Sequence, residues 1–218
     1  MIQQGFAFLL KGGWIMGPLF LCAIVSVAVM IERNIVLRRE RRAGDAVTER
    51  VTGHLRAGDY SGALTTAEAS LGVIAKVLAA GLRNHPLGTV AVDQAMQAAA
   101  LRQLTTLNER LGWLDTIITM APLLGLLGTI TGMIRAFQVV ATVSGAGAAP
   151  AITGGVAEAL IATATGLAVA VTTLPVYNNL GEMVRDLTSN MEASATEIQG
   201  LLSALPKEVA HATAATAP

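Results

Sequence analysis

Two long stretches of this chain are almost free of charged side chains. Residues 12–31 carry none, and residues 116–181 carry only two, Arg135 and Glu158. About 20 apolar residues are enough for a helix to cross the roughly 30 Å hydrocarbon core of a bilayer. The stretch 116–181 is too long for one helix, and the segment 142–150, which contains Gly, Ser and Pro, interrupts it. The sequence therefore predicts an all-α membrane protein with three transmembrane helices.

The composition agrees with this prediction. Charged residues make up 14% of the 218 residues, whereas a soluble domain has about a quarter. The formal net charge is zero, so no overall basic field indicates binding to nucleic acid. Cys22 is the single cysteine, which excludes an intrachain disulfide. His54 and His85 have no Cys, His or carboxylate neighbours at ligand spacing, so we expect neither a metal nor a cofactor.

Arginines give the expected orientation in the membrane. Five of them follow the first apolar stretch, at positions 33, 38, 39, 41 and 42. The positive-inside rule places this end in the cytoplasm and the N-terminus on the outer side of the membrane. The expected parts are a periplasmic segment 1–11, a first transmembrane helix 12–37, a cytoplasmic helical segment 38–112, a second transmembrane helix 113–141, a periplasmic loop 142–151, a third transmembrane helix 152–180, and a cytoplasmic C-terminal helix with a disordered tail at 181–218.

The segment between the first and second spans is expected to be helical, because Ala, Leu, Gln, Glu and Arg dominate it. Gly and Asp residues that interrupt the helical pattern predict three helices, at about 41–56, 60–83 and 89–112. We expect the last of them to continue into the second span without a break. The transmembrane helices would then extend into a cytoplasmic helical bundle.

The second span carries a stripe of small residues. Positions 122, 125, 129, 132 and 136 share one helical face and are Pro, Gly, Thr, Gly and Ala. Gly128 and Gly132 also form a GxxxG pair, which lets helices approach closely in lipid. Close helix packing is the simplest interpretation of Gly125, Gly128 and Gly132. The stripe also presents one hydroxyl, that of Thr129.

The third span has small or polar groups on most sides. Glu158, Thr165 and Thr172 repeat every seven residues on one face, and Thr163 and Thr173 lie on another. Gly166 and several alanines fill the space between them. A helix with so little bulk is expected to be wrapped by other helices or to line a cavity.

Prolines interrupt the backbone hydrogen bonding of the last two spans. Pro122 and Pro175 each remove a donor and clash with a preceding carbonyl, so both helices are expected to kink there. Two bent helices with threonine stripes suggest the wall of a pore.

Glu158 has three interpretations. A carboxylate in an apolar span costs roughly 2–4 kcal/mol on insertion scales, so it needs a reason to be there. It could carry protons, pair with arginine or hydroxyls of a neighbouring subunit, or cap the start of its helix. Arg135 is a candidate partner, because both residues fall in the outer half of their spans.

The strings "APLLGLLGTITGMIRAF" and "GGVAEALIATATGLAVAVTTLPVYN" resemble the MotA/TolQ/ExbB proton channel family, and the resemblance covers about residues 10–200. It implies that Thr129 and Thr163 are pore threonines, that Glu158 is the intramembrane glutamate, and that Pro122 and Pro175 are the span prolines. Thr165, Thr172 and Arg135 would belong to the pore or to a subunit interface. Three spans without a large cytoplasmic torque domain favour the ExbB/TolQ branch, from which Arg135 departs.

The resemblance also implies partners. Five copies would form a homopentamer in the bacterial inner membrane, around two copies of a single-span ExbD/TolR-like protein. That partner supplies the proton-accepting aspartate, and proton flow drives rotation that reaches a TonB/TolA-like or other periplasm-spanning protein.

Other classes of function are less favoured. A secondary transporter that binds a solute itself would be expected to show an inverted repeat, which three spans do not provide. A structural membrane scaffold would use the threonines for packing alone. The sequence has no metal-ligand spacing, P-loop or G-x-S-x-G motif, so we do not expect an enzyme.

Overall fold

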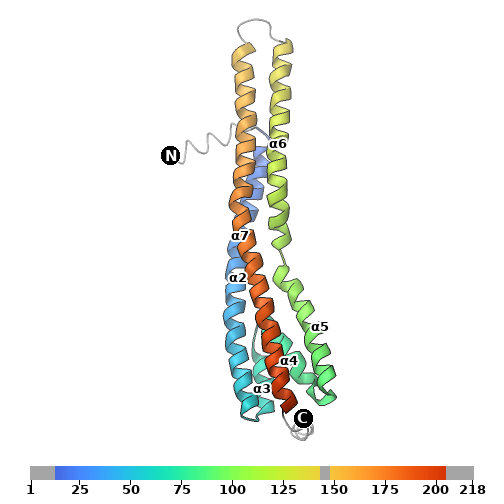
Figure 1. The fold of residues 1–218 in the computed structure, drawn as a ribbon. Helices are drawn as coiled ribbons and strands as arrows, with labels where there is room; N and C mark the ends of the chain where they lie inside the picture. The colour runs from blue at the N-terminus through green and yellow to red at the C-terminus, as the bar shows by residue number, and fades with distance from the viewer. Residues whose placement is uncertain (1–12, 143–147, 205–218) are drawn as a thin grey trace. The chain divides into compact units, whose positions relative to one another are not determined.

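The computed structural model describes residues 13–142 and 148–204, and every regular element in these residues is helical (Figure 1). The elements are α2 (Met16–Arg56), α3 (Tyr60–Ala69), α4 (Val73–Asn84), the 3-10 turn η1 (His85–Leu87), α5 (Thr89–Asn108), α6 (Leu111–Thr142) and α7 (Ala148–Ala204). The helices α2, α6 and α7 are long and apolar enough to cross a membrane. The all-α fold with three candidate spans is thus confirmed. The expected segment 1–11 and the tail after residue 204 lie outside the described residues.

The chain divides into two compact units. The membrane unit comprises Met1–Glu32 and Arg110–Asn179, and the bundle unit comprises Arg33–Glu109 and Leu180–Pro218. Because α2 and α7 are single long helices, each of them contributes residues to both units.

In the membrane unit, the beginning of α2 packs against α6 and α7. Ile15, Met16 and Leu19 are buried together with Ala121 of α6, and Val169 of α7 covers this cluster. Large apolar side chains face outward on the same helices, among them Ile130, Phe137, Leu160 and Val171. A soluble protein rarely exposes so much contiguous apolar surface, whereas lipid or neighbouring subunits would cover it in a membrane.

The bundle unit has a conventional apolar core. The core side chains come from the second half of α2, from α3 and α4, and from the end of α7; they include Val47, Val51, Leu55, Ala63, Ile74, Leu78, Leu82, Leu187, Met191 and Ile198. The hydroxyl of Tyr60 donates a hydrogen bond to the carbonyl of Leu82, which ties α3 to the end of α4. Asp59 begins α3 as its N-cap and accepts a hydrogen bond from the Gly62 amide.

Two expected helices in this region differ from the structure. The predicted helix 60–83 is wrong because the chain leaves the helical path at residues 70–72, where Gly72 has φ +131°. Only glycine adopts this conformation without strain. The amide of Val73, which starts α4, then donates to Glu40 Oε2 over 2.8 Å.

The expected continuity between 89–112 and the second span is also wrong. The helix α5 ends at Asn108, and α6 begins at Leu111. Between them, Glu109 is extended with ψ 136° and Arg110 has φ +64°, so the helical hydrogen-bond ladder stops. Within the membrane unit, Arg110 Nη1 pairs with Glu32 Oε2 over 2.5 Å.

The other helix bounds also differ from the expected ranges. The first span and the expected helix 41–56 form one uninterrupted helix, α2. The helix α7 begins at Ala148, four residues before the expected start at 152.

Candidate functional site

The membrane parts of α6 and α7 touch along a seam of glycine and alanine. A Cβ atom on Gly132 would lie 2.8 Å from Ala159 Cβ, and one on Gly128 would lie 2.5 Å from Ala162 Cβ. A Cβ on Gly125 would lie 3.0 Å from Thr163 Cα. Distances this short leave no room for a side chain, so the glycines allow the two backbones to meet. We call these contacts, together with Ala121, Ala136, Gly155 and Gly166, the α6–α7 seam.

The face of α6 that contacts α7 differs from the face that we expected from the sequence. The members of the α6–α7 seam on α6 are Ala121, Gly125, Gly128, Gly132 and Ala136, and all five are buried. Only the smallest side chains fit where the two helices come closest. Ala121 and Gly128 therefore lie on this face of α6, where we expected residues 122 and 129. The bulkier Pro122 and Thr129 lie beside the seam and are half-buried.

Thr163 connects the two helices through its hydroxyl. Thr163 Oγ1 donates a hydrogen bond of 2.8 Å to the backbone carbonyl of Gly125. The carbonyl is reachable because glycine has no side chain to shield it and the helices are in contact at this level. The Thr163 oxygen keeps lone pairs that can accept a hydrogen bond from water or from a protonated group.

The other threonine hydroxyls bond within their own helices. Thr129 Oγ1 donates to Leu126 O over 2.6 Å, Thr165 Oγ1 to Ile161 O over 2.8 Å, and Thr172 Oγ1 to Ala168 O over 2.8 Å. This arrangement satisfies each of these donors without water, as an apolar environment requires. In the described part of the chain, no hydrogen bond joins these three threonines to Thr163.

Glu158 lies against two other segments. Its Oε1 is 3.2 Å from Arg135 Nη1 of α6, and its side chain is 31% exposed. A Cβ atom on Gly13 would overlap the same oxygen, so the carboxylate packs directly on the backbone just before α2. Gly13 has φ +73°, which favours glycine there. The ion pair that we considered from the sequence is therefore present, and it forms within one chain.

Both prolines lie inside continuous helices. Pro122 is within α6 and Pro175 is within α7, and neither one ends its helix. The kinks at these positions stay predictions.

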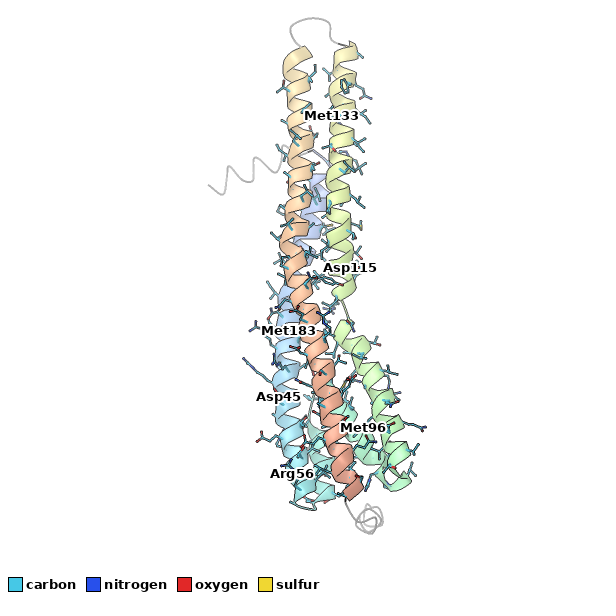
Figure 2. The ribbon with its side chains drawn as sticks, in the orientation of Figure 1. Asp45, Arg56, Met96, Asp115, Met133 and Met183 are labelled. Atoms are coloured by element: carbon cyan, nitrogen blue, oxygen red, sulfur yellow. The ribbon has the colours of Figure 1, made fainter. Side chains whose placement is uncertain are left out.

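Two cavities of the bundle unit lie away from these residues in the chain. One of about 590 Å³ is lined by residues of α2 and α7 that include Asp45, Arg56 and Ser194. The other, of about 140 Å³, is lined by residues of α4, α5 and α7 that include Met96. Figure 2 labels Met96 on α5. None of the predicted site residues lines either cavity. Across residues 13–142 and 148–204, no group of three His, Cys, Asp or Glu side chains could hold a metal ion.

Sequence reasoning missed several residues of this site. It did not assign Gly13 to Glu158, because nothing local indicates that these two segments meet. It also left out Gly155, Ala159 and Ala162 of the α6–α7 seam, although their spacing of three and four residues is a helical-face signal.

The comparison with known families bears on the same segment. The sequence model of the MotA/TolQ/ExbB proton channel family matches residues 69–193 of the chain. This range is more than half of the 218 residues and includes Thr129, Glu158 and Thr163. A search of curated proteins found no match.

Proposed function

The chain belongs to the MotA/TolQ/ExbB proton channel family, and on this premise we propose that it is the ExbB/TolQ-like subunit of a proton-driven motor. The family supports a membrane-embedded, stator-type channel subunit and not an enzyme. In our proposal, five copies enclose two copies of a single-span ExbD/TolR-like partner. Proton flow through this assembly drives mechanical work on a periplasm-spanning protein.

The observation that carries the proposal is the hydrogen bond from Thr163 Oγ1 to Gly125 O across the α6–α7 seam. A proton path through an apolar region needs polar atoms at fixed positions, because bulk water is absent there. The seam fixes Thr163, and the bond to Leu126 O fixes Thr129. Five copies of each hydroxyl would form two narrow polar collars, with the threonine oxygens accepting hydrogen bonds from water or from the partner's protonated carboxyl group.

Glu158 fits the structural interpretation better than the proton-carrier interpretation. Its carboxylate already has a cationic partner in Arg135 and packs on Gly13. A paired charge in an apolar region is far less costly than an isolated one. We propose that the pair joins the three spans of one subunit and that the proton moves past it.

The proposed orientation follows from the arginines after the first span. We place the N-terminus in the periplasm and the bundle unit in the cytoplasm of a bacterial inner membrane, because positive residues remain on the cytoplasmic side. The proposal assigns Thr165 and Thr172 to the pore or to a subunit interface.

Native mass spectrometry tests the composition. The chain is purified in detergent, alone and co-expressed with the product of the adjacent gene. The proposal predicts five copies of this chain with two of a small single-span protein. A monomer or dimer without a partner would contradict it and would favour a solute transporter or a structural scaffold.

A further inference from the structure

Most arginines of the chain have partners, but one short run does not. All twelve arginines lie in the described residues, and seven of them make a hydrogen bond or an ion pair. The remaining five are Arg38, Arg39, Arg41, Arg42 and Arg102, which form no such interaction within the part of the chain that the structure describes. Four of these five are thus concentrated in one turn and a half of α2.

The four arginines 38, 39, 41 and 42 form one surface, which we call the arginine patch. Residues three or four apart are neighbours on a helix, and 38 with 41 and 42, and 39 with 42, have this spacing. All four side chains are exposed. The opposite side of this turn faces the bundle core, where Leu37 is fully buried and Gly44 lies against Ile74.

Nothing in the same turn neutralises the patch. The single carboxylate in this turn of α2 is Glu40, and Glu40 Oε2 accepts the hydrogen bond from the amide of Val73. The carboxylate is therefore directed toward the start of α4. The next acid along α2, Asp45, makes no ion pair with Arg41 or Arg42 in the described residues. The patch therefore keeps all four of its positive charges.

The patch lies where an apolar helix face ends. Ile24, Val27, Ile31 and Ile35 are exposed and recur at intervals of three or four residues along α2. With the same interval, Arg38 and Arg42 come next on that face. A face that changes from isoleucine to arginine within one turn matches the boundary between lipid tails and headgroups.

We propose that the arginine patch binds the headgroup phosphates of anionic phospholipids. The planar guanidinium group donates two parallel hydrogen bonds to a phosphate, which a lysine cannot do. Clusters of basic residues directly after a membrane span are attracted to anionic leaflets. This inference goes beyond the proposed function, because it requires neither proton conduction nor the partner.

The test measures lipid binding to the purified full-length protein by native mass spectrometry. The probes are phosphatidylglycerol, which is anionic, and phosphatidylcholine, which is zwitterionic, with the same acyl chains. The wild type is expected to bind phosphatidylglycerol more tightly. The variant Arg38→Gln/Arg42→Gln is expected to lose about tenfold or more of that affinity, with the affinity for phosphatidylcholine unchanged.

A matched control removes two exposed arginines outside the patch, Arg102→Gln/Arg185→Gln, and should bind both lipids as the wild type does. Equal affinities of the wild type for the two lipids would overturn the proposal. An equal loss in the control would overturn it as well, because net charge alone would then account for the effect. Unchanged affinity in the patch variant, with a shift in oligomer mass, would instead assign the patch to a subunit contact.

Loss of arginines can disturb membrane insertion, so a second variant keeps the charge. Replacing all four patch residues with lysine preserves the signal that sets orientation but removes the two-bond geometry. The lysine variant is expected to bind phosphatidylglycerol several-fold more weakly than the wild type. If its affinity is unchanged, the assignment to these arginines fails.

Discussion

Thr163 combines two roles in a single hydroxyl group. It donates to Gly125 O across the α6–α7 seam, and its oxygen can still accept a hydrogen bond. Hydrogen bonds between helices in membranes contribute only about 0.6 kcal/mol on average, so assembly should not depend on this one. A polar path, in contrast, depends on every group along it.

The variant Thr163→Val tests this distinction, because valine keeps the shape and removes the hydroxyl. We expect proton-driven function to be lost while the native mass of the complex stays the same. Thr163→Ser restores the hydroxyl and should recover function. Normal function in the valine variant would remove Thr163 from the proton path.

Arg135 and Glu158 are expected to be energetically coupled. Each single variant, Arg135→Gln or Glu158→Gln, leaves one charge in an apolar region without its partner. We therefore expect the double variant to be more stable than the sum of the single effects predicts, by about 1 kcal/mol. Thermal unfolding in detergent measures this. The exposed pair Glu182–Arg185 is the control and should give additive effects; additivity at 135 and 158 would sink the idea.

We expect the stability of the bundle unit to depend on pH through Asp59. The hydrogen bond from the Gly62 amide, with smaller contributions from His54 and Ser61, lowers the pKa of this carboxyl below its usual 3.8. A carboxyl whose pKa is lower in the folded state than in the unfolded state stabilises the fold at pH values above its unfolded-state pKa. This stabilisation is lost as the pH falls through the folded-state pKa. Asp59→Ala should thus lower the thermal midpoint at pH 7, with a difference that shrinks below about pH 4. A difference that does not change with pH would contradict this account.

At the scale of the helices, the α6–α7 seam is the feature that fixes the site. The variant Gly132→Ala places a Cβ atom 2.8 Å from Ala159 Cβ and 3.0 Å from Gly155 O, so the helices must move apart. We expect a loss of about 1–3 kcal/mol in the free energy of unfolding, as for other overpacked sites. Thermal unfolding of the purified protein measures it.

Gly154→Ala provides the matched control on α7, because a Cβ atom there meets nothing within 4 Å. Alanine favours a helix over glycine by up to about 1 kcal/mol, so this variant should be neutral or more stable. Equal losses in both variants would mean that helix propensity or lipid contact, and not the seam, determines the stability of α6 and α7.

The sequence predicted the helices of this chain unevenly, for physical reasons. The spans were predictable because a stretch of some 20 apolar residues without charge is typical of a transmembrane helix. The break before Gly72 carried a weak signal, since one glycine inside a helical pattern is often tolerated. The break at Arg110 carried almost none, because no Gly or Pro lies between residues 89 and 111 and tertiary pairing holds the left-handed conformation.

The candidate site was predictable by residue type, but few of its contacts were. The glycines and threonines of α6 and α7 could be named from their spacing. The Arg135–Glu158 contact could be considered because both residues fall in the outer half of their spans. Which residues touch, such as Ala121 in place of Pro122, depends on the rotation of each helix. Periodicity fixes that rotation only to within about one residue, which is about 100°.

At the scale of the whole molecule, the division into a membrane unit and a bundle unit agrees with a channel subunit that has a large part outside the membrane. The family match begins in α3, within the bundle unit, and ends in α7. The match includes a little under half of the bundle unit, residues 69–109 and 180–193, as well as two of the three spans. We therefore expect both units to be needed for function.

The central claim is that this chain forms part of a proton path. The most direct measurement is the proton flux into liposomes that contain the complex with its single-span partner, driven by a pH gradient and reported by an enclosed pH-sensitive dye. The account predicts a flux that requires both proteins and that Thr163→Val abolishes without changing the native mass. The account would be contradicted by a complex that contains five copies of this chain and two of the partner but gives a flux no greater than that of empty liposomes.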